Sequence, residues 1–128
     1  MTAAALLLTT SAVSAPVRRL TSSATWDGRE PLALPGGGML RLDGAAGFDA
    51  ALRVRARRGG ERIALPGRGH HHALKHVLQA LGMPPWERER LPLLEDAGGT
   101  LLAAGDRAIA APLQAWLDAR GARLAWTP

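Results

Sequence analysis

A strict alternation of apolar residues and arginines over residues 52–57 constrains the fold more than any other feature of the sequence. In LRVRAR every second side chain is apolar and an arginine follows each one. Because successive side chains of a β-strand point to opposite faces, this period of two predicts a strand with one face in the core and a cationic outer face. Gly59 and Gly60 follow in RGGER, which predicts a turn. The fold therefore includes a half-buried sheet.

Three further segments have the pattern of short strands separated by glycine turns. PLALPGGGMLRL at 31–42 predicts two strands around the glycines, and LPLLEDAGGTLLAAG at 91–105 predicts a β-hairpin around Gly98 and Gly99. ARLAW at 122–126 predicts a strand near the end of the chain. Most of the strands are therefore expected to pair as hairpins.

Between these strands the apolar period changes to that of a helix. Over 72–81 the apolar residues recur at i, i+3, i+4 and i+7, and Gly82 stands where a helix ends. The predicted core face is Leu74, Val77, Leu78 and Leu81, and the predicted wet face is His72, Lys75, His76 and Gln79. The pattern predicts an amphipathic helix with a polar, partly cationic outer side.

Two more helices are predicted towards the end of the chain. MPPWERERL at 83–91 predicts a short helix that starts at Pro84 and Pro85 and is ended by Pro92. A helix over 111–120 ends at Gly121, and its predicted core face is Leu113, Trp116 and Leu117.

Strands separated by a helical pair predict an α+β fold, in which small β-sheets and hairpins pack with a central helical pair and a C-terminal helix. Its 128 residues suit one domain, expected over 26–128. Residues 1–25 are simple in composition and are expected to be a low-complexity tail or linker remnant.

The positive charge of the chain is concentrated in its middle third. The net charge is +5, and between residues 50 and 90 nine Arg and Lys residues stand against three Glu. The rest of the chain has seven cations and eight acids. Such localised charge favours an anionic partner, with nucleic acid first and a phosphorylated ligand or membrane surface behind it. A solvated arginine-rich surface would give the same pattern.

All four histidines lie within HHHALKH at 70–76. His72 and His76 are four residues apart and could share one Zn²⁺, but the spacing nominates no third ligand and the chain has no Cys. The cations Arg68 and Lys75 disfavour a dication, so no metal site is expected. The alternative is an exported, basic metal-binding protein that uses His72 and His76. Against it, no positive charge precedes the apolar run near the N-terminus.

No catalytic motif is recognisable in the sequence. It contains neither a phosphate-binding G-x-x-x-x-G-K-[ST] loop nor a G-x-G-x-x-G turn. The serines lie in the simple N-terminal segment without a nearby histidine. We expect no catalytic residue and no cofactor in this chain.

Four short motifs between residues 57 and 105 occur in the order of a known family. They are RRGGER, LKHVLQ, PPWER and PLL. The sequence resembles the C-terminal domain of tRNA(Ile)-lysidine synthase over about residues 26–126. The resemblance assigns structural roles to the motif residues Gly59, Gly60, Glu61, Leu74, Gln79, Pro84, Pro85, Trp86 and Pro92.

The resemblance implies a function in tRNA modification. The full-length family enzyme uses ATP, with magnesium, to adenylate the wobble cytidine of a minor isoleucine tRNA and then joins lysine to it. That step belongs to a catalytic domain with a Ser-Gly-Gly-x-Asp-Ser pyrophosphate loop, which this sequence lacks. The resemblance thus implies a cytoplasmic tRNA-recognising domain that is no enzyme on its own. It would contact the acceptor-stem side of the tRNA, work with a catalytic domain in cis or in trans, and bind no membrane.

Charge, periodicity and resemblance together nominate the residues that contact the tRNA backbone. They are Arg53, Arg55, Arg57, Arg58, Arg62, Arg68, His72, Lys75, His76 and Arg88. Turn amides at Gly59 and Gly60 and a helix N-terminus near His71 would also favour a phosphate. Trp86 is more typical of a core residue between helices than of a base-stacking platform. A third hypothesis is a module that docks a separate catalytic chain through the arginines and binds no RNA.

Overall fold

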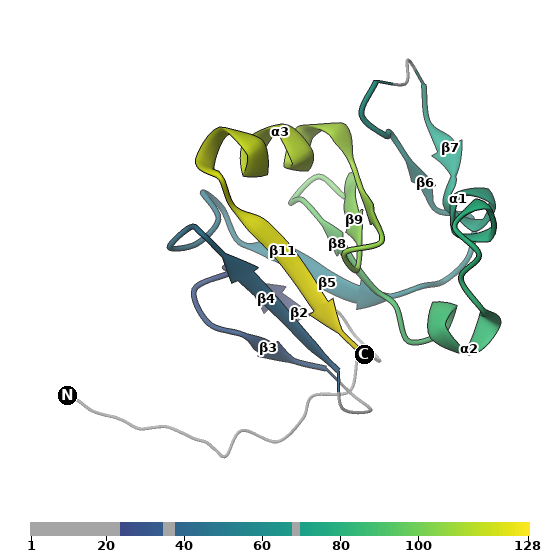
Figure 1. Ribbon diagram of the computed structural model, residues 1–128, viewed down its shortest axis with the longest axis horizontal. Helices are drawn as coiled ribbons and strands as arrows, with labels where there is room; N and C mark the ends of the chain where they lie inside the picture. Colours follow the sequence, from purple (N-terminus) through teal and green to yellow (C-terminus); the bar gives the residue numbers. More distant parts are fainter. Residues whose placement is uncertain (1–23, 35–37, 68–69) are drawn as a thin grey trace.

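The computed structural model in Figure 1 describes residues 24–34, 38–67 and 70–128. In chain order the elements are β2 (Ala24–Trp26), β3 (Leu32–Ala33), β4 (Met39–Asp43), β5 (Leu52–Ala56), β6 (Arg62–Ile63), β7 (His72–Ala73), α1 (Leu74–Ala80), α2 (Pro85–Arg88), β8 (Pro92–Glu95), β9 (Leu101–Ala104), β10 (Ala108–Ile109), α3 (Ala111–Arg120) and β11 (Arg123–Thr127). The predicted α+β class is confirmed. Among the described residues no helix is long and apolar enough to cross a membrane.

The strands form three antiparallel sheets. A five-stranded sheet has the order β10-β9-β8-β5-β2, a three-stranded sheet has the order β11-β4-β3, and β6 pairs with β7. Strand β11, the last in the chain, pairs with β4 over its full length. The C-terminal segment therefore forms one edge of the three-stranded sheet. In Figure 1 this sheet lies in front of β5 and β2.

The core lies where the two larger sheets and the helices meet. Leu40 and Leu124 of the three-stranded sheet belong to the same buried cluster as Val54 and Leu93 of the five-stranded sheet. Strands β8 and β9 are buried at every position, whereas β4 alternates between buried and exposed residues. The predicted half-buried strand β5 is confirmed by Leu52 and Val54, which are 7% and 0% exposed.

The described residues of the segments 57–67 and 70–90 form a projecting lobe, which we call the basic lobe. It contains β6, β7, α1 and α2, the teal elements at the right of Figure 1. Three fully buried side chains, Ile63, Leu74 and Leu78, join the lobe to the common core. The amide of Ala111 at the start of α3 also donates to the Ala64 carbonyl, with an N···O distance of 2.8 Å. Side-chain packing and a backbone hydrogen bond thus connect the lobe to the rest of the fold.

Several predicted elements are confirmed. Strands β3 and β4 pair as expected, β8 and β9 form the hairpin with Gly99 at a φ of +87°, and α3 covers 111–120 and ends at Gly121. Strand β2 starts at Ala24, two residues before the predicted domain boundary. Residues 1–23 lie outside the described residues.

The helical pair differs from the prediction in its boundaries. Helix α1 starts at Leu74 rather than residue 72, because His72 and Ala73 pair with β6. Leu81 lies beyond the last residue of α1 and is 55% exposed, so its predicted place in the core is wrong. Helix α2 ends at Arg88, four residues before Pro92, which instead begins β8.

Candidate nucleic-acid interface

Two glutamates hold the arginines of β5. The Arg55 guanidinium donates from Nε to Glu95 Oε2 and from a terminal nitrogen to Glu61 Oε2, both at 3.0 Å. A terminal nitrogen of Arg53 donates to Glu95 Oε1 at 3.3 Å. The Arg53 side chain is 48% exposed but that of Arg55 only 12%. The expectation of a cationic outer face therefore holds for Arg53 and is wrong for Arg55, because the neighbouring strand β8 supplies Glu95.

The carboxylate of Glu61 stabilises the glycine turn that follows β5 by accepting hydrogen bonds from the backbone of the turn. Glu61 accepts from the Arg58 amide at 2.8 Å and from the Gly59 amide at 3.1 Å. The predicted turn is confirmed, with φ angles of +94° and +80° at Gly59 and Gly60. Because the Glu61 carboxylate already accepts from the Gly59 amide, the expected phosphate-binding role of the Gly59 and Gly60 amides is not supported for Gly59.

The Arg55–Glu61 pair is stabilised in its charged form. Burial alone would raise the pKa of Glu61, but hydrogen bonds from the Arg58 amide and the Arg55 side chain outweigh it, so the pKa lies below its ordinary value. Burial alone would lower the pKa of Arg55, and the hydrogen bonds to Glu61 and Glu95 reverse this and raise it. Arg55 therefore has its positive charge balanced within the fold.

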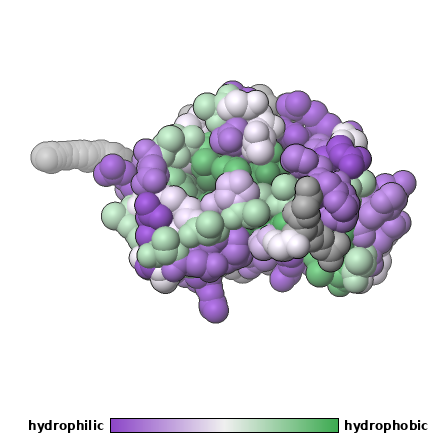
Figure 2. Space-filling view, turned by 90° about the horizontal axis from the view of Figure 1, so that it is seen from above, coloured by the Kyte–Doolittle hydropathy of each residue, from purple (hydrophilic) through white to green (hydrophobic). Residues whose placement is uncertain are grey.

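Other cations, on the basic lobe, have no carboxylate among the described residues to neutralise their charge. Within the described ranges, five of the nominated Arg and Lys residues form no ion pair with a carboxylate: Arg57, Arg58, Arg62, Lys75 and Arg88. We call these five residues the unpaired cations. Arg62 donates to the His71 carbonyl at 3.0 Å, which leaves its charge uncompensated. Seen from above, the end of the molecule that carries the basic lobe is largely hydrophilic (Figure 2).

Arg57 and Arg88 share a further property. In each, the Nε atom is shielded from solvent and finds no hydrogen-bond partner among the described residues. A buried donor without an acceptor costs free energy. These two half-buried arginines therefore carry a polar cost that the described residues do not compensate.

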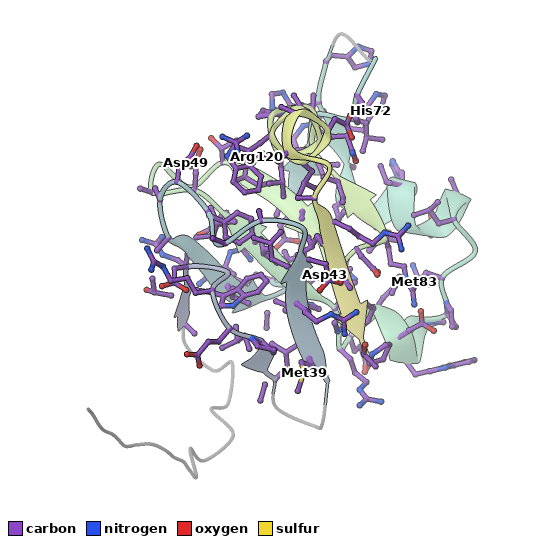
Figure 3. All side chains as sticks on the ribbon, turned by 60° about the vertical axis from the view of Figure 1, so that its left-hand side comes forward. Met39, Asp43, Asp49, His72, Met83 and Arg120 are labelled. Atoms are coloured by element: carbon purple, nitrogen blue, oxygen red, sulfur yellow. The ribbon has the colours of Figure 1, made fainter. Side chains whose placement is uncertain are left out.

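The structure brings His72 and His76 to one groove of about 240 Å³, although they come from β7 and α1. The other residues that line this groove are apolar. The His72 ring also lies 4.6 Å from that of His70, measured between centroids, at the upper end of the basic lobe (Figure 3). Across the described part of the chain, no three His, Cys, Asp or Glu side chains come together as metal ligands. Arg68, also nominated, lies outside the described residues.

Trp86 does not reach the core. Its side chain is 72% exposed, and none of the four residues of α2 is buried. The prediction of a core residue between helices is wrong, because Met83 before α2 and Leu91 after it fill that role, at 6% and 1% exposed. The charges around it in PPWERER were the sequence signal for this exposure.

A second polar cluster, which sequence reasoning missed, lies on α3. Asp49 accepts from Trp116 Nε1 at 2.9 Å and lies 3.4 Å from the Arg120 guanidinium (Figure 3). That guanidinium covers the Trp116 ring at 4.1 Å from its centroid. Asp49 and α3 are far apart in sequence, so no local pattern indicated this contact. Arg120 therefore has a carboxylate partner and does not add uncompensated positive charge to the surface.

Comparisons with known proteins identify the family. The model described as "TilS substrate C-terminal domain" matches residues 52–126. A tRNA(Ile)-lysidine synthase from Xanthomonas axonopodis pv. citri is 61% identical over 105 residues, which cover 80% of this chain and 24% of that protein. The enzyme of the same name from Xylella fastidiosa strain Temecula1 is 54% identical over 106 residues, with 79% and 24% covered.

A solved structure supports the same fold. The crystal structure of the TilS C-terminal domain superimposes with a TM-score of 0.51 at 23% identity, and the match covers 83% of this chain and 97% of that one. The architecture is therefore that of a small α+β C-terminal domain of this kind. The chain belongs to the tRNA(Ile)-lysidine synthase family, in its substrate C-terminal domain. It spans about a quarter of the length of these relatives.

Proposed function

We propose that this chain is the tRNA-binding C-terminal domain of a tRNA(Ile)-lysidine synthase. It holds the acceptor-stem side of the minor isoleucine tRNA while a catalytic domain, in cis or in trans, attaches lysine to the wobble cytidine. ATP and magnesium serve that catalytic domain, and the present chain needs no cofactor and makes no lysidine alone. A cytoplasmic location follows from the tRNA partner.

The observation that carries the proposal is the division of the cations into two groups. Arg53 and Arg55 are paired with glutamates, whereas the unpaired cations of the basic lobe have no carboxylate partner among the described residues. Outside the lobe, Arg123 of β11 is the described arginine that likewise forms no ion pair. Positive charge without a carboxylate partner is what a phosphate backbone neutralises, with release of its counterions. We therefore propose the unpaired cations as the main contacts, with Arg53, Arg68, His72 and His76 in supporting roles. Arg55 serves the fold.

The first experiment measures the affinity for tRNA as a function of salt. The logarithm of the binding constant should fall by roughly 0.7–0.9 per log unit of salt for each phosphate neutralised. Fluorescence anisotropy of labelled tRNA between about 50 and about 200 mM salt resolves such a slope. A flat salt dependence, or no binding to any tRNA, would contradict the proposal and favour the hypothesis of a docking module.

A pair of matched variants locates the interface. The double variant Arg57→Ala, Arg58→Ala should weaken tRNA binding. It should also reduce the slope of log affinity against log salt by roughly the amount expected for two phosphate contacts. The control, Arg41→Ala with Arg120→Ala, removes two arginines that are paired with Asp43 and Asp49 away from the basic lobe. An equal loss of affinity in both double variants would show that total charge alone, and not the basic lobe, drives the binding.

A further inference from the structure

Trp86 has the largest exposed fraction among the large apolar side chains that the structure describes. It is 72% exposed, against 55% for Leu81 and 42% for Met39. Trp26 and Trp126, by comparison, are 4% and 5% exposed. An indole in water forgoes the stabilisation that burial of its large apolar surface would bring. The fold therefore gains little from this side chain, and a partner that covered it would bury a large apolar surface.

The backbone that carries Trp86 is held firmly. Met83, labelled beside the helical pair in Figure 3, is buried at one end of α2, and Leu91 is buried just beyond the other end. Two prolines precede the ring, and the amides of Arg88 and Glu89 donate to the Pro84 and Pro85 carbonyls at 3.0 and 3.1 Å. A ring presented from an anchored turn loses little backbone freedom when a ligand covers it.

The surroundings of Trp86 indicate what would cover it. The four residues that follow it are charged, in the order Glu, Arg, Glu, Arg, so the chain that continues from the ring adds no apolar surface to it. A stable protein interface buries about 800 Å² on each partner, far more than one ring offers. A single flat aromatic ring on a lobe rich in unpaired cations instead matches one nucleobase, whose face stacks on aromatic side chains while its phosphates meet arginine.

We propose that Trp86 is a stacking platform for an unpaired base of the bound RNA. The proposal rests on the proposed function, because that function supplies the RNA. Stacking needs a base face that no neighbouring base covers, so the ligand is a nucleotide of a single-stranded tail or one turned out of a helix. The unpaired cations bind the phosphate backbone of the base-paired region. Trp86 stacks on a base only if a nucleotide outside the base pairs follows that region.

The test compares two RNA hairpins with the same stem and loop, one of which carries a single-stranded 3′ tail. Trp86→Leu should weaken binding of the tailed hairpin roughly 5- to 100-fold, the range that loss of base–aromatic stacking gives. Trp86→Phe should retain most of the affinity, and all three proteins should bind the hairpin without a tail equally. Tryptophan emission should be quenched by the tailed hairpin in the wild type and much less in Trp86→Leu.

Leu81→Ala is the matched control, because Leu81 is also exposed and lies on the same lobe but has no ring. It should leave both affinities unchanged. Salt-dependent binding that is equal in wild type and Trp86→Leu for both hairpins would overturn the stacking proposal and leave the proposed function standing. An equal loss on both hairpins would also overturn it, and the absence of binding to either would overturn both. An unchanged unfolding midpoint shows that the variants are folded.

Discussion

Arg55 and Glu61 together join the basic lobe to the five-stranded sheet. Arg55 extends from β5 and reaches Glu95 on β8 as well as Glu61 beyond the glycine turn. Glu61 in turn holds the turn amides, and its own carbonyl accepts from the Leu74 amide at the start of α1 at 2.9 Å. A small set of side chains therefore determines how the turn, the sheet and the first helix meet.

Arg55→Ala should destabilise the protein by about 2–3 kcal/mol, because it leaves two largely buried carboxylates without their main partner. Arg53→Ala, which removes a half-exposed partner of Glu95, should cost less than about 1 kcal/mol. Urea denaturation of both variants measures the difference. Equal costs would mean that Arg55 is not the centre of the cluster.

Glu61 should make stability depend on pH on the acid side. Its pKa in the folded state lies below the ordinary value, so its contribution is fully present above the unfolded pKa of about 4.3. That contribution is lost as the pH falls through the folded pKa, where the carboxylate takes up a proton. The free energy of unfolding of Glu61→Gln should therefore fall less steeply below about pH 4.3 than that of the wild type. Parallel profiles from denaturation at a series of pH values would contradict this.

At the scale of elements, the turn between β9 and β10 depends on a glycine. Gly105 has a φ of +52°, and a Cβ there would lie 2.8 Å from Leu91 Cδ1 and 2.9 Å from Trp126 Cε3. Both neighbours are buried, at 1% and 5% exposed. The close approach of this turn to β11 is thus possible only without a side chain.

Gly105→Ala should cost about 3 kcal/mol, from the left-handed backbone together with the overpacked contact. Gly99→Ala is its control, because Gly99 also has a positive φ, of +87°, but its Cβ would meet no atom within 4 Å. The control should cost about 1 kcal/mol. Thermal or urea unfolding distinguishes the two, and equal losses would show that the space at Gly105 does not matter.

At the scale of the whole molecule, the basic lobe and the sheets share one core. Ile63, Leu74 and Leu78 of the lobe are fully buried in the same cluster as Trp26 and Trp126 of the sheets. One backbone hydrogen bond, from the Ala111 amide of α3 to the Ala64 carbonyl of the lobe, crosses the same boundary. The lobe is therefore expected to unfold together with the sheets.

Leu78→Ala tests this cooperativity. Removal of a fully buried leucine from the lobe should cost about 3 kcal/mol. The loss should lower the unfolding midpoint equally when it is followed by far-ultraviolet circular dichroism and by tryptophan emission in a Trp86→Leu background, whose remaining indoles lie outside the lobe. A lower midpoint in circular dichroism alone would show that the lobe unfolds by itself.

Prediction from the sequence succeeded where a pattern is local. The alternation at 52–56 predicted β5, the glycines at 98 and 99 predicted the hairpin of β8 and β9, and Gly121 marked the end of α3. It failed at the start of α1, where pairing with β6 overrides the helical period at His72. It also failed at Trp86 and Leu81, because apolar character alone does not show which of several nearby residues reaches the core.

The sequence by itself determined the α+β class, the family and the concentration of positive charge in residues 50–90, because periodicity, motif order and charge are properties of neighbouring residues. Only the tertiary structure decided which cations are available to a partner. Arg55 is balanced because Glu95, forty residues away in sequence, lies diagonally across from it on the neighbouring strand β8. Arg57 and Lys75 meet no such carboxylate among the described residues. Pairing across strands brings distant charges together, and no local pattern records it.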